Sequence, residues 1–145
     1  MQHAINAIDF HCHGVGRFDF TNISSLDLVE IEAILAKRQH KTILTLYLPK
    51  VNLNAFLAFM LDFSAKKSQG CFPHIQGIAL EGPLLSSRGG TPKNSLWVPT
   101  KSEWQMLANC GKLGLIYMIM SPDSPVFDHT GKTHRTDRPA HSIEW

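Results

Sequence analysis

The chain has 145 residues, of which 43% are hydrophobic and 18% are charged, and its formal net charge at pH 7 is +2. A chain of this length can bury one hydrophobic core but not two comfortable ones, so we expect a single globular domain. The weak and scattered positive charge argues against the dense basic face of a nucleic-acid-binding protein. We therefore expect no nucleic-acid partner.

The cysteines and the apolar runs indicate the cellular compartment. Cys12, Cys71 and Cys110 are odd in number and lie far apart in the sequence, which favours a reducing environment. The apolar stretches fall short of the roughly 20 residues that a membrane-spanning helix needs. The first residues also lack the basic start and long apolar core of a secretion signal. We expect a cytoplasmic protein with no membrane partner.

Strand-like and helix-like segments alternate along most of the sequence. Short apolar runs bounded by Gly or Pro predict buried strands, and apolar residues at helical spacing predict amphipathic helices. In chain order we expect a strand at residues 4–10, a glycine-containing loop at 14–22, a helix at 26–37, a strand at 42–48, a helix at 53–67, a strand at 75–80, a helix from the Thr100 cap to the stop at Gly111, and a strand at 113–120.

Two helix starts and one loop carry further signals. Ser24 or Ser25 can cap the first helix, and Thr100 followed three residues later by Glu103 forms a capping box for the third. The loop over residues 81–99 is long and rich in Gly, Pro and Ser. Loops of that length without regular structure are usually functional or mobile.

Four strands alternating with three helices predict an α/β fold with a parallel sheet and right-handed crossovers. We expect a partial TIM-barrel-like sheet, since a closed eight-stranded barrel needs about 250 residues. Periodicity alone leaves an open doubly wound sheet as the alternative. The predicted domain covers residues 1–125. The apolar pattern ends there, and residues 126–145 are expected to form an irregular or disordered tail.

Two histidines stand two positions apart near the end of the first expected strand, in a run Asp-Phe-His-Cys-His-Gly that begins at Asp9. Alternate residues of a strand face the same way, so Asp9, His11 and His13 would project together. Two converging imidazoles form half of a zinc-type site. The third expected strand ends in Glu81, followed by Gly-Pro. A carboxylate there could complete the site.

Each of these residues also has an interpretation without a metal. His11 and His13 could be loop histidines, and Glu81 could pair with a Lys or Arg at the strand end. Asp9 could either orient a ligand or bond to nearby backbone. Cys12 would point to the opposite face of a regular strand, which favours a structural buried thiol. The six other histidines show no paired spacing with a third ligand, and we expect them at the surface.

Together the two motifs resemble the amidohydrolase superfamily, and within it the N-acetylglucosamine-6-phosphate deacetylases. That family carries Asp-x-His-x-His-Gly after the first barrel strand and Leu-Glu-Gly-Pro after the third, which correspond here to residues 9–14 and 80–83. Residues 42–49 resemble its second barrel strand, and the Ser-Pro-Asp at 121–123 is similar to its Ala-Pro-Glu. The likeness covers about residues 5–125.

The resemblance implies a TIM-barrel hydrolase in which His11, His13 and Glu81 help to hold one or two divalent metals. Zinc is the first choice, with iron, manganese or cobalt as alternatives. The implied reaction is deacetylation of a small amino-sugar phosphate by metal-activated water. The family's later metal-binding histidines and its catalytic aspartate have no counterpart in this sequence, so the catalytic residue is unknown. We expect a fragment or a truncated gene product.

The loop after the second motif and the predicted sheet edges keep other functions open. Where the family usually has Lys-Gly-Ala-His, this chain has Arg-Gly-Gly-Thr, and Arg88 with the backbone N–H groups of Gly89 and Gly90 could contact an anionic substrate. A different amidohydrolase, acting on another amide or a cyclic amide, is one alternative. Another is a non-catalytic half-barrel that binds metal weakly, or that associates with a partner or with itself through unpaired sheet edges.

Overall fold

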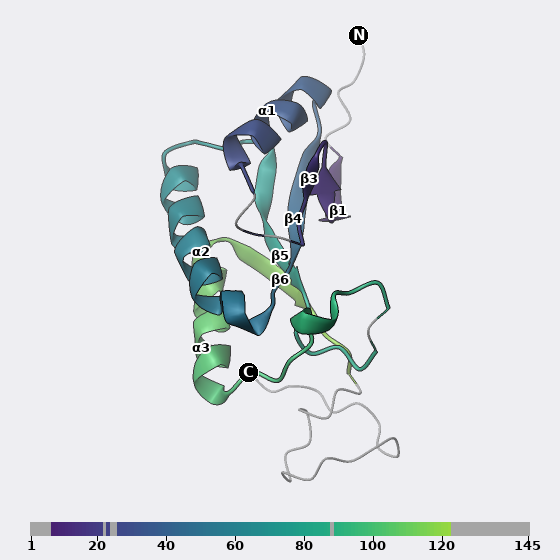
Figure 1. The fold of residues 1–145 in the computed structure, drawn as a ribbon. Coiled ribbons are helices and arrows are strands. Elements are labelled where there is room, and N and C mark those ends of the chain that lie inside the picture. The colour runs from purple at the N-terminus through teal and green to yellow at the C-terminus, as the bar shows by residue number, and fades with distance from the viewer. Residues whose placement is uncertain (1–6, 22, 24–25, 88, 123–145) are drawn as a thin grey trace.

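The structure is a computed structural model that describes residues 7–21, 23, 26–87 and 89–122. Its main sheet has four parallel strands in the order β1-β4-β5-β6, and three α helices connect them (Figure 1). The predicted α/β class and the alternation of strands with helices are therefore confirmed. The strands are β1 (Ile8–Cys12), β4 (Lys41–Tyr47), β5 (Ile75–Glu81) and β6 (Leu115–Ile119), and the helices are α1 (Leu28–Arg38), α2 (Leu53–Ser68) and α3 (Lys101–Asn109).

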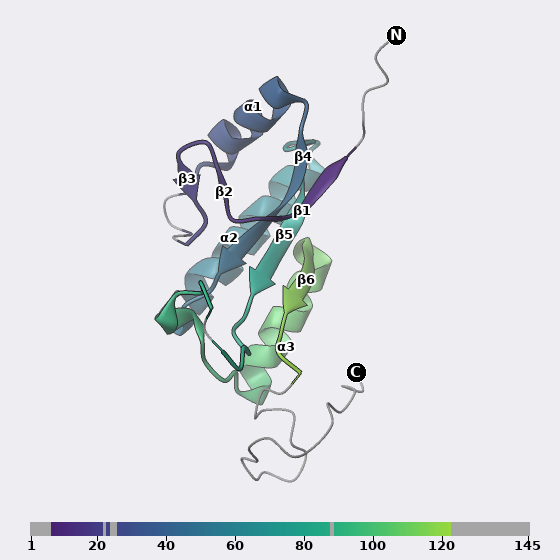
Figure 2. The ribbon, with the colours of Figure 1, turned by 90° about the vertical axis from the view of Figure 1, so that its right-hand side faces the viewer.

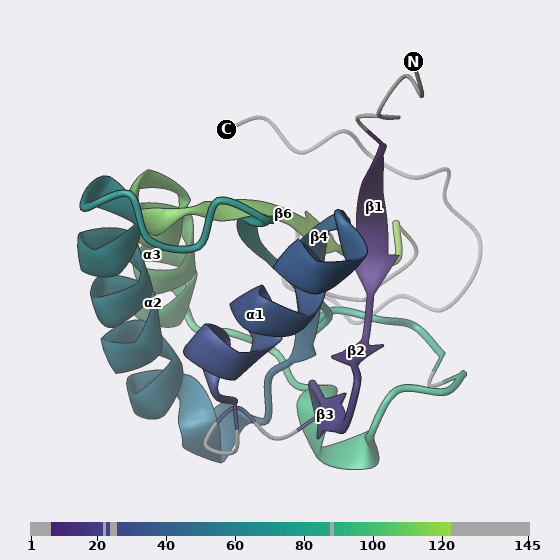
Figure 3. The same cartoon turned by 90° about the horizontal axis from the view of Figure 1, so that it is seen from above.

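All three helices lie on one side of the main sheet (Figures 2 and 3). The strand order follows the chain order without a reversal, and right-handed crossovers between such strands place every helix on the same side. A doubly wound sheet would instead carry helices on both faces. This arrangement is that of a segment of a barrel wall.

The core lies between the sheet and the helices. Side chains that alternate along β4 and β5, such as Leu44, Leu46, Ile78 and Leu80, are fully buried on the helix side. The helices contribute apolar residues at helical spacing, among them Phe56, Met60 and Phe63 of α2 and Ile31 and Leu35 of α1.

The face of the sheet away from the helices carries smaller and more polar side chains. Thr45 on β4 and Ala79 on β5 are fully buried there. Tyr117 on the edge strand β6 donates its hydroxyl to the backbone carbonyl of Phe10 on the opposite edge strand β1, and its hydroxyl oxygen lies 3.5 Å from that of Thr45. One side chain thus links the two edges, so the sheet curls over this face.

The first helix begins later than the sequence predicted. Asp27 is its N-cap, because the Asp27 carboxylate accepts hydrogen bonds from the backbone amides of Val29 and Glu30, both at 3.0 Å. The prediction of Ser24 or Ser25 as the cap is wrong, because Asp27 occupies the cap position. An Asp caps a helix as well as a Ser does. Those two serines lie outside the described residues. The capping box at the start of α3 is confirmed.

The predicted loop at residues 14–22 contains a short antiparallel hairpin, formed by β2 (Gly14–Val15) and β3 (Phe18–Asp19). Its turn passes through Gly16, whose φ of +61° lies in the left-handed region that favours glycine. Val15 on β2 is buried, and Phe20, which follows the hairpin, is fully buried. The loop prediction was wrong here because two-residue strands are too short to show a period.

Other sequence predictions are tested only in part. The strand expected at residues 4–10 is described from Ile8 onward, and the tail expected at 126–145 lies outside the described residues. Cys12, Cys71 and Cys110 are all free. In the described part of the chain, every helix is too short or too polar to cross a bilayer.

Candidate metal centre

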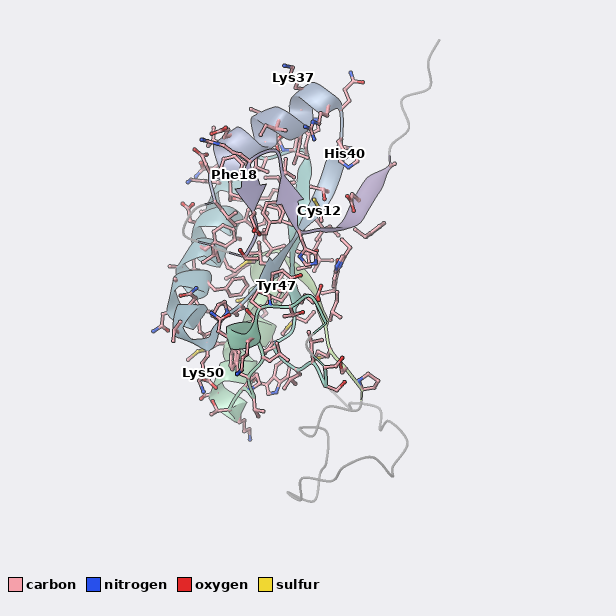
Figure 4. The ribbon with its side chains drawn as sticks, turned by 45° about the vertical axis from the view of Figure 1, so that its right-hand side comes forward. Cys12, Phe18, Lys37, His40, Tyr47 and Lys50 are labelled. Carbon is pink, nitrogen blue, oxygen red and sulfur yellow. The ribbon has the colours of Figure 1, made fainter. Side chains whose placement is uncertain are left out.

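His11, His13 and Glu81 come together at the carboxyl end of the curled sheet. β1 ends just before His13, and β5 ends at Glu81. The central strand β4 lies between them and ends at Tyr47, which pairs with Glu81 and is labelled in Figure 4. Parallel strands deliver their last residues to the same edge of a sheet, which is where barrel folds place their sites.

The three side chains present one ligand atom each, and these atoms form a nearly regular triangle. His11 Nε2 and His13 Nε2 are 2.9 Å apart. Glu81 Oε2 lies 2.9 Å from His13 Nε2 and 3.2 Å from His11 Nε2. Ligand atoms at about 2.1 Å from one ion are separated by about 3.0 Å in octahedral and about 3.4 Å in tetrahedral geometry. The observed triangle fits one face of such a coordination shell.

His13 is held on two sides. Its Nδ1 lies 3.0 Å from the backbone carbonyl of Thr45, and its ring stacks on that of Tyr47 with centroids 4.6 Å apart and an interplanar angle of 2°. The His11 ring meets the His13 ring edge-on, at 87°. A carbonyl can only accept, so Nδ1 of His13 carries the hydrogen and Nε2 faces the centre.

With His13 Nδ1 donating to Thr45, neither His13 Nε2 nor the Glu81 carboxylate has a hydrogen to donate to the other. Nε2 of a neutral His13 is a bare acceptor once Nδ1 donates to Thr45, and an ionised Glu81 carboxylate also only accepts. The two acceptors are nevertheless 2.9 Å apart, a distance at which they repel each other unless a proton or a metal cation lies between them. The arrangement is therefore suited to a bound cation.

The site is open to solvent on one side. The His11 side chain is 45% exposed, that of His13 30% and that of Glu81 21%. His11 is the most exposed of the three side chains, so solvent reaches the site from its side. Three protein ligands with an open position are typical of catalytic zinc sites, whereas structural zinc sites are closed by four.

Two further residues complete the site, and the sequence interpretation missed both. Thr91, which is 1% exposed, donates its hydroxyl to Glu81 Oε1 at 2.9 Å. The Tyr47 hydroxyl lies 3.4 Å from His13 Nε2. Burial, followed by the negative charges of Glu81 and Asp19, raises the pKa of Tyr47 above its usual value, so its hydroxyl stays protonated at neutral pH. Thr91 carried a weak signal, because it lies in a Gly-rich loop ten residues after Glu81.

Asp9 and Cys12 stand apart from the three ligand atoms. Asp9 accepts a hydrogen bond from the backbone amide of His11 at 3.1 Å, which is the backbone contact that the sequence left as an alternative. The pairing of β1 with β4 shifts register between Asp9 and Cys12, so strict alternation does not hold there. Cys12 is partly buried, and its thiol donates to the carbonyl of Gly14 at 3.1 Å.

The predicted substrate-binding residues are described only in part. Arg88 lies outside the described residues. Gly89 and Gly90 are exposed, and Gly89 has a φ of +51°. Contact of these residues with substrate stays a prediction.

His74 differs from the surface histidine that the sequence suggested. Its Nδ1 lies 2.6 Å from Glu32 Oε1, and its side chain is only 26% exposed. The Glu32 carboxylate also accepts the backbone amides of His74 and Ile75. This pair ties α1 to the start of β5, at the end of the strand opposite to Glu81. Its role is structural.

Comparison of the chain with protein-family models, curated proteins and solved structures finds no significant match. The likeness of the two motifs to the amidohydrolases therefore stays a sequence-based interpretation. The chemistry of the site is inferred from its own atoms.

Proposed function

We propose that this chain binds one divalent metal ion through His11, His13 and Glu81 and acts as, or derives from, a metal-dependent amide hydrolase. The observation that carries the proposal is the convergence of two imidazole nitrogens and one carboxylate oxygen within 3.2 Å of one another. Two imidazoles and a carboxylate suit zinc, and they also accept iron, manganese or cobalt. A mixed set of this kind with an open side favours catalysis over a purely structural role.

The bound metal would supply Lewis-acid activation of water and of an amide carbonyl. The residues of the chain prepare the site for that reaction. Thr45 holds the His13 imidazole in the tautomer that offers Nε2, and Glu81 brings a negative charge that favours a cation. The protonated Tyr47 hydroxyl stands beside the site as a donor. No catalytic acid or base is assigned among the described residues.

The proposed substrate is a small acetylated amino-sugar phosphate, as in the N-acetylglucosamine-6-phosphate deacetylases that the motifs resemble, and the proposed location is the cytoplasm. Gly89 and Gly90 are exposed in the loop that follows Glu81, and the backbone N–H groups of Gly-rich loops can bind a phosphate. Arg88 would add a positive charge to the same loop. A different amide or cyclic amide fits the metal chemistry equally well, because the fold does not fix the substrate.

Metal binding is tested first. The chain is purified, stripped with a chelator and titrated with Co²⁺ while the visible absorption is followed. We expect saturable binding that is weakened about 100-fold or more by His13→Ala or Glu81→Gln, because each change removes one of three ligands. His40→Ala is the matched control, since His40 is exposed and makes no contact with the three ligand atoms among the described residues. No Co²⁺ or Zn²⁺ binding by the wild-type chain would refute the proposal.

The reaction is tested on the metal-loaded chain. Acetate release from N-acetylglucosamine-6-phosphate is compared with release from an unphosphorylated acetamide and with ring opening of a cyclic amide. Acetate release that depends on the metal and on Glu81 would support the deacetylase function. Ring opening alone would favour the other amidohydrolase chemistry, and metal binding without turnover would favour a non-catalytic half-barrel.

A second candidate function is association through the sheet edges. Within the described residues, β1 and β6 each pair with only one neighbour in the main sheet. Phe10 on β1 is 63% exposed and Ile116 on β6 is 51% exposed. Open edges with apolar side chains favour pairing with another chain. Light scattering after size exclusion tests this function, and a monomer at all concentrations would count against it.

A further inference from the structure

The two oxygens of the Glu81 carboxylate have different partners. Oε2 faces the two histidines, at 2.9 Å from His13 Nε2 and 3.2 Å from His11 Nε2. Oε1 accepts a hydrogen bond of 2.9 Å from the hydroxyl of Thr91. One oxygen of the carboxylate therefore faces the candidate metal centre, and the other binds the loop that follows β5.

Thr91 is well suited to hold this carboxylate in one orientation. It is 1% exposed, so its hydroxyl needs a partner inside the protein. Its β-branched side chain has little freedom about χ1. A hydrogen bond to a charged acceptor is also stronger than one between neutral groups.

The loop that carries Thr91 is itself fixed to the sheet. At its start, the Gly82 amide donates to the carbonyl of Ile119 on β6 at 3.0 Å. Gly82 has a φ of +90°, which allows the chain to turn away directly after Glu81. At its far end, the Trp97 indole N–H donates to the carbonyl of Leu48, just after β4, at 2.7 Å. Thr91 thus lies between one anchor on β6 and another directly after β4.

We propose that Thr91 is a positioning residue that occupies one oxygen of Glu81, so that Glu81 gives a single bond to a single metal ion. This inference rests on the proposed function. A carboxylate that chelates one ion, or bridges two ions, uses both of its oxygens, and the hydrogen bond from Thr91 competes with a metal ion for Oε1. With Oε1 bound to Thr91, Glu81 is monodentate and the site holds one ion per chain. The partners of metal ligands commonly set the orientation and affinity of those ligands in this way.

The test is a Co²⁺ titration of the whole chain with Thr91→Val, which removes the hydroxyl and keeps the shape, and Thr91→Ser, which restores a hydroxyl. We expect one Co²⁺ per wild-type chain. Thr91→Val should weaken binding about 10- to 100-fold, because the carboxylate loses its fixed orientation, and it should change the visible spectrum, because the freed oxygen can approach the ion. Thr91→Ser should stay within about threefold of the wild type.

Ser95→Ala is the matched control for a general loop effect. Ser95 lies in the same loop and is fully buried, and in the described part of the chain its hydroxyl has no hydrogen-bond partner. Its removal should leave both Co²⁺ affinity and spectrum unchanged. Thermal unfolding of each variant shows whether the fold is retained.

The outcomes separate this inference from the proposed function. A wild-type chain that binds no Co²⁺ refutes both. A wild-type chain that binds Co²⁺ while folded Thr91→Val binds it equally well, with the same spectrum, refutes only the role of Thr91. Two Co²⁺ ions of similar affinity per wild-type chain would also overturn it, and this result does not depend on any variant folding.

Discussion

The imidazole of His13 lies flat on the phenol ring of Tyr47, with ring centroids 4.6 Å apart and an interplanar angle of 2°. This stack and the bond to the Thr45 carbonyl fix the plane and the tautomer of one proposed ligand before any metal arrives. Ligands whose orientation is fixed in advance lose less conformational entropy on binding. The stack therefore contributes to the proposed metal affinity without touching the ion.

Replacing Tyr47 tests this contribution. Tyr47→Leu removes the flat ring, and we expect Co²⁺ affinity to fall about tenfold because His13 can then rotate. Tyr47→Phe keeps the ring and loses only a hydroxyl that lies 3.4 Å from His13 Nε2, so its affinity should stay within about threefold. Equal affinities for the Leu and Phe variants would show that the stack does not position His13.

The hydrogen bond from Tyr117 to the Phe10 carbonyl predicts a measurable stability effect. This bond joins the two edges of the sheet. Its loss leaves the Phe10 carbonyl without the Tyr117 hydroxyl as a partner. Tyr117→Phe should lower the free energy of unfolding by about 0.5–1.5 kcal/mol, measured by urea denaturation. Tyr47→Phe is the matched control, and its hydroxyl contact is long enough that we expect a smaller loss. A larger loss for Tyr47→Phe would contradict the proposed link between the edges.

The regular elements could be predicted because burial follows a period. The helix expected at residues 53–67 is observed at Leu53–Ser68, and its apolar stripe is buried through Phe56, Met60 and Phe63. The strand expected at 75–80 extends by one residue to Glu81. The approach of His11, His13 and Glu81 followed from the rule that parallel strands end at one edge.

The details of the site could not be predicted in the same way. Regular alternation predicts that the two histidines face the same way, yet β1 ends at Cys12 and its pairing with β4 shifts register after Asp9. The partners that orient the ligands are a backbone carbonyl at Thr45 and a hydroxyl at Thr91. Every residue has a carbonyl, and the sequence does not show which one faces a ring thirty-two positions away.

We predict that the side chain of Asp27 stabilises α1. Its carboxylate accepts the amides of Val29 and Glu30, and its negative charge lies at the positive end of the helix. Asp27→Ala should reduce the free energy of unfolding by about 1 kcal/mol, whereas Asp27→Ser, which keeps an acceptor, should cost only a few tenths, about 0.3 kcal/mol. Asp62→Ala is the control, because Asp62 lies within α2, where its carboxylate pairs with Lys66. Equal losses for Asp27→Ala and Asp27→Ser would contradict the cap.

We predict that Cys71 reacts with an alkylating reagent faster than Cys110 does. Cys71 is exposed, whereas Cys110 is 1% exposed and its thiol donates to the carbonyl of Met106. Burial raises the pKa of the Cys110 thiol above its usual value, so less of the reactive thiolate is present at any given pH. Iodoacetamide should modify Cys71 at least about tenfold faster than Cys110 at pH 8.

Raising the pH should speed the labelling of Cys110 and so reduce this contrast. The Cys110 thiolate forms only at a higher pH than that of an ordinary thiol, because burial raises its pKa. Peptide mass spectrometry after timed labelling measures both rates in one sample. Urea provides the control, since unfolding exposes both thiols and should make their rates similar. Equal rates in the folded chain would contradict the burial of Cys110.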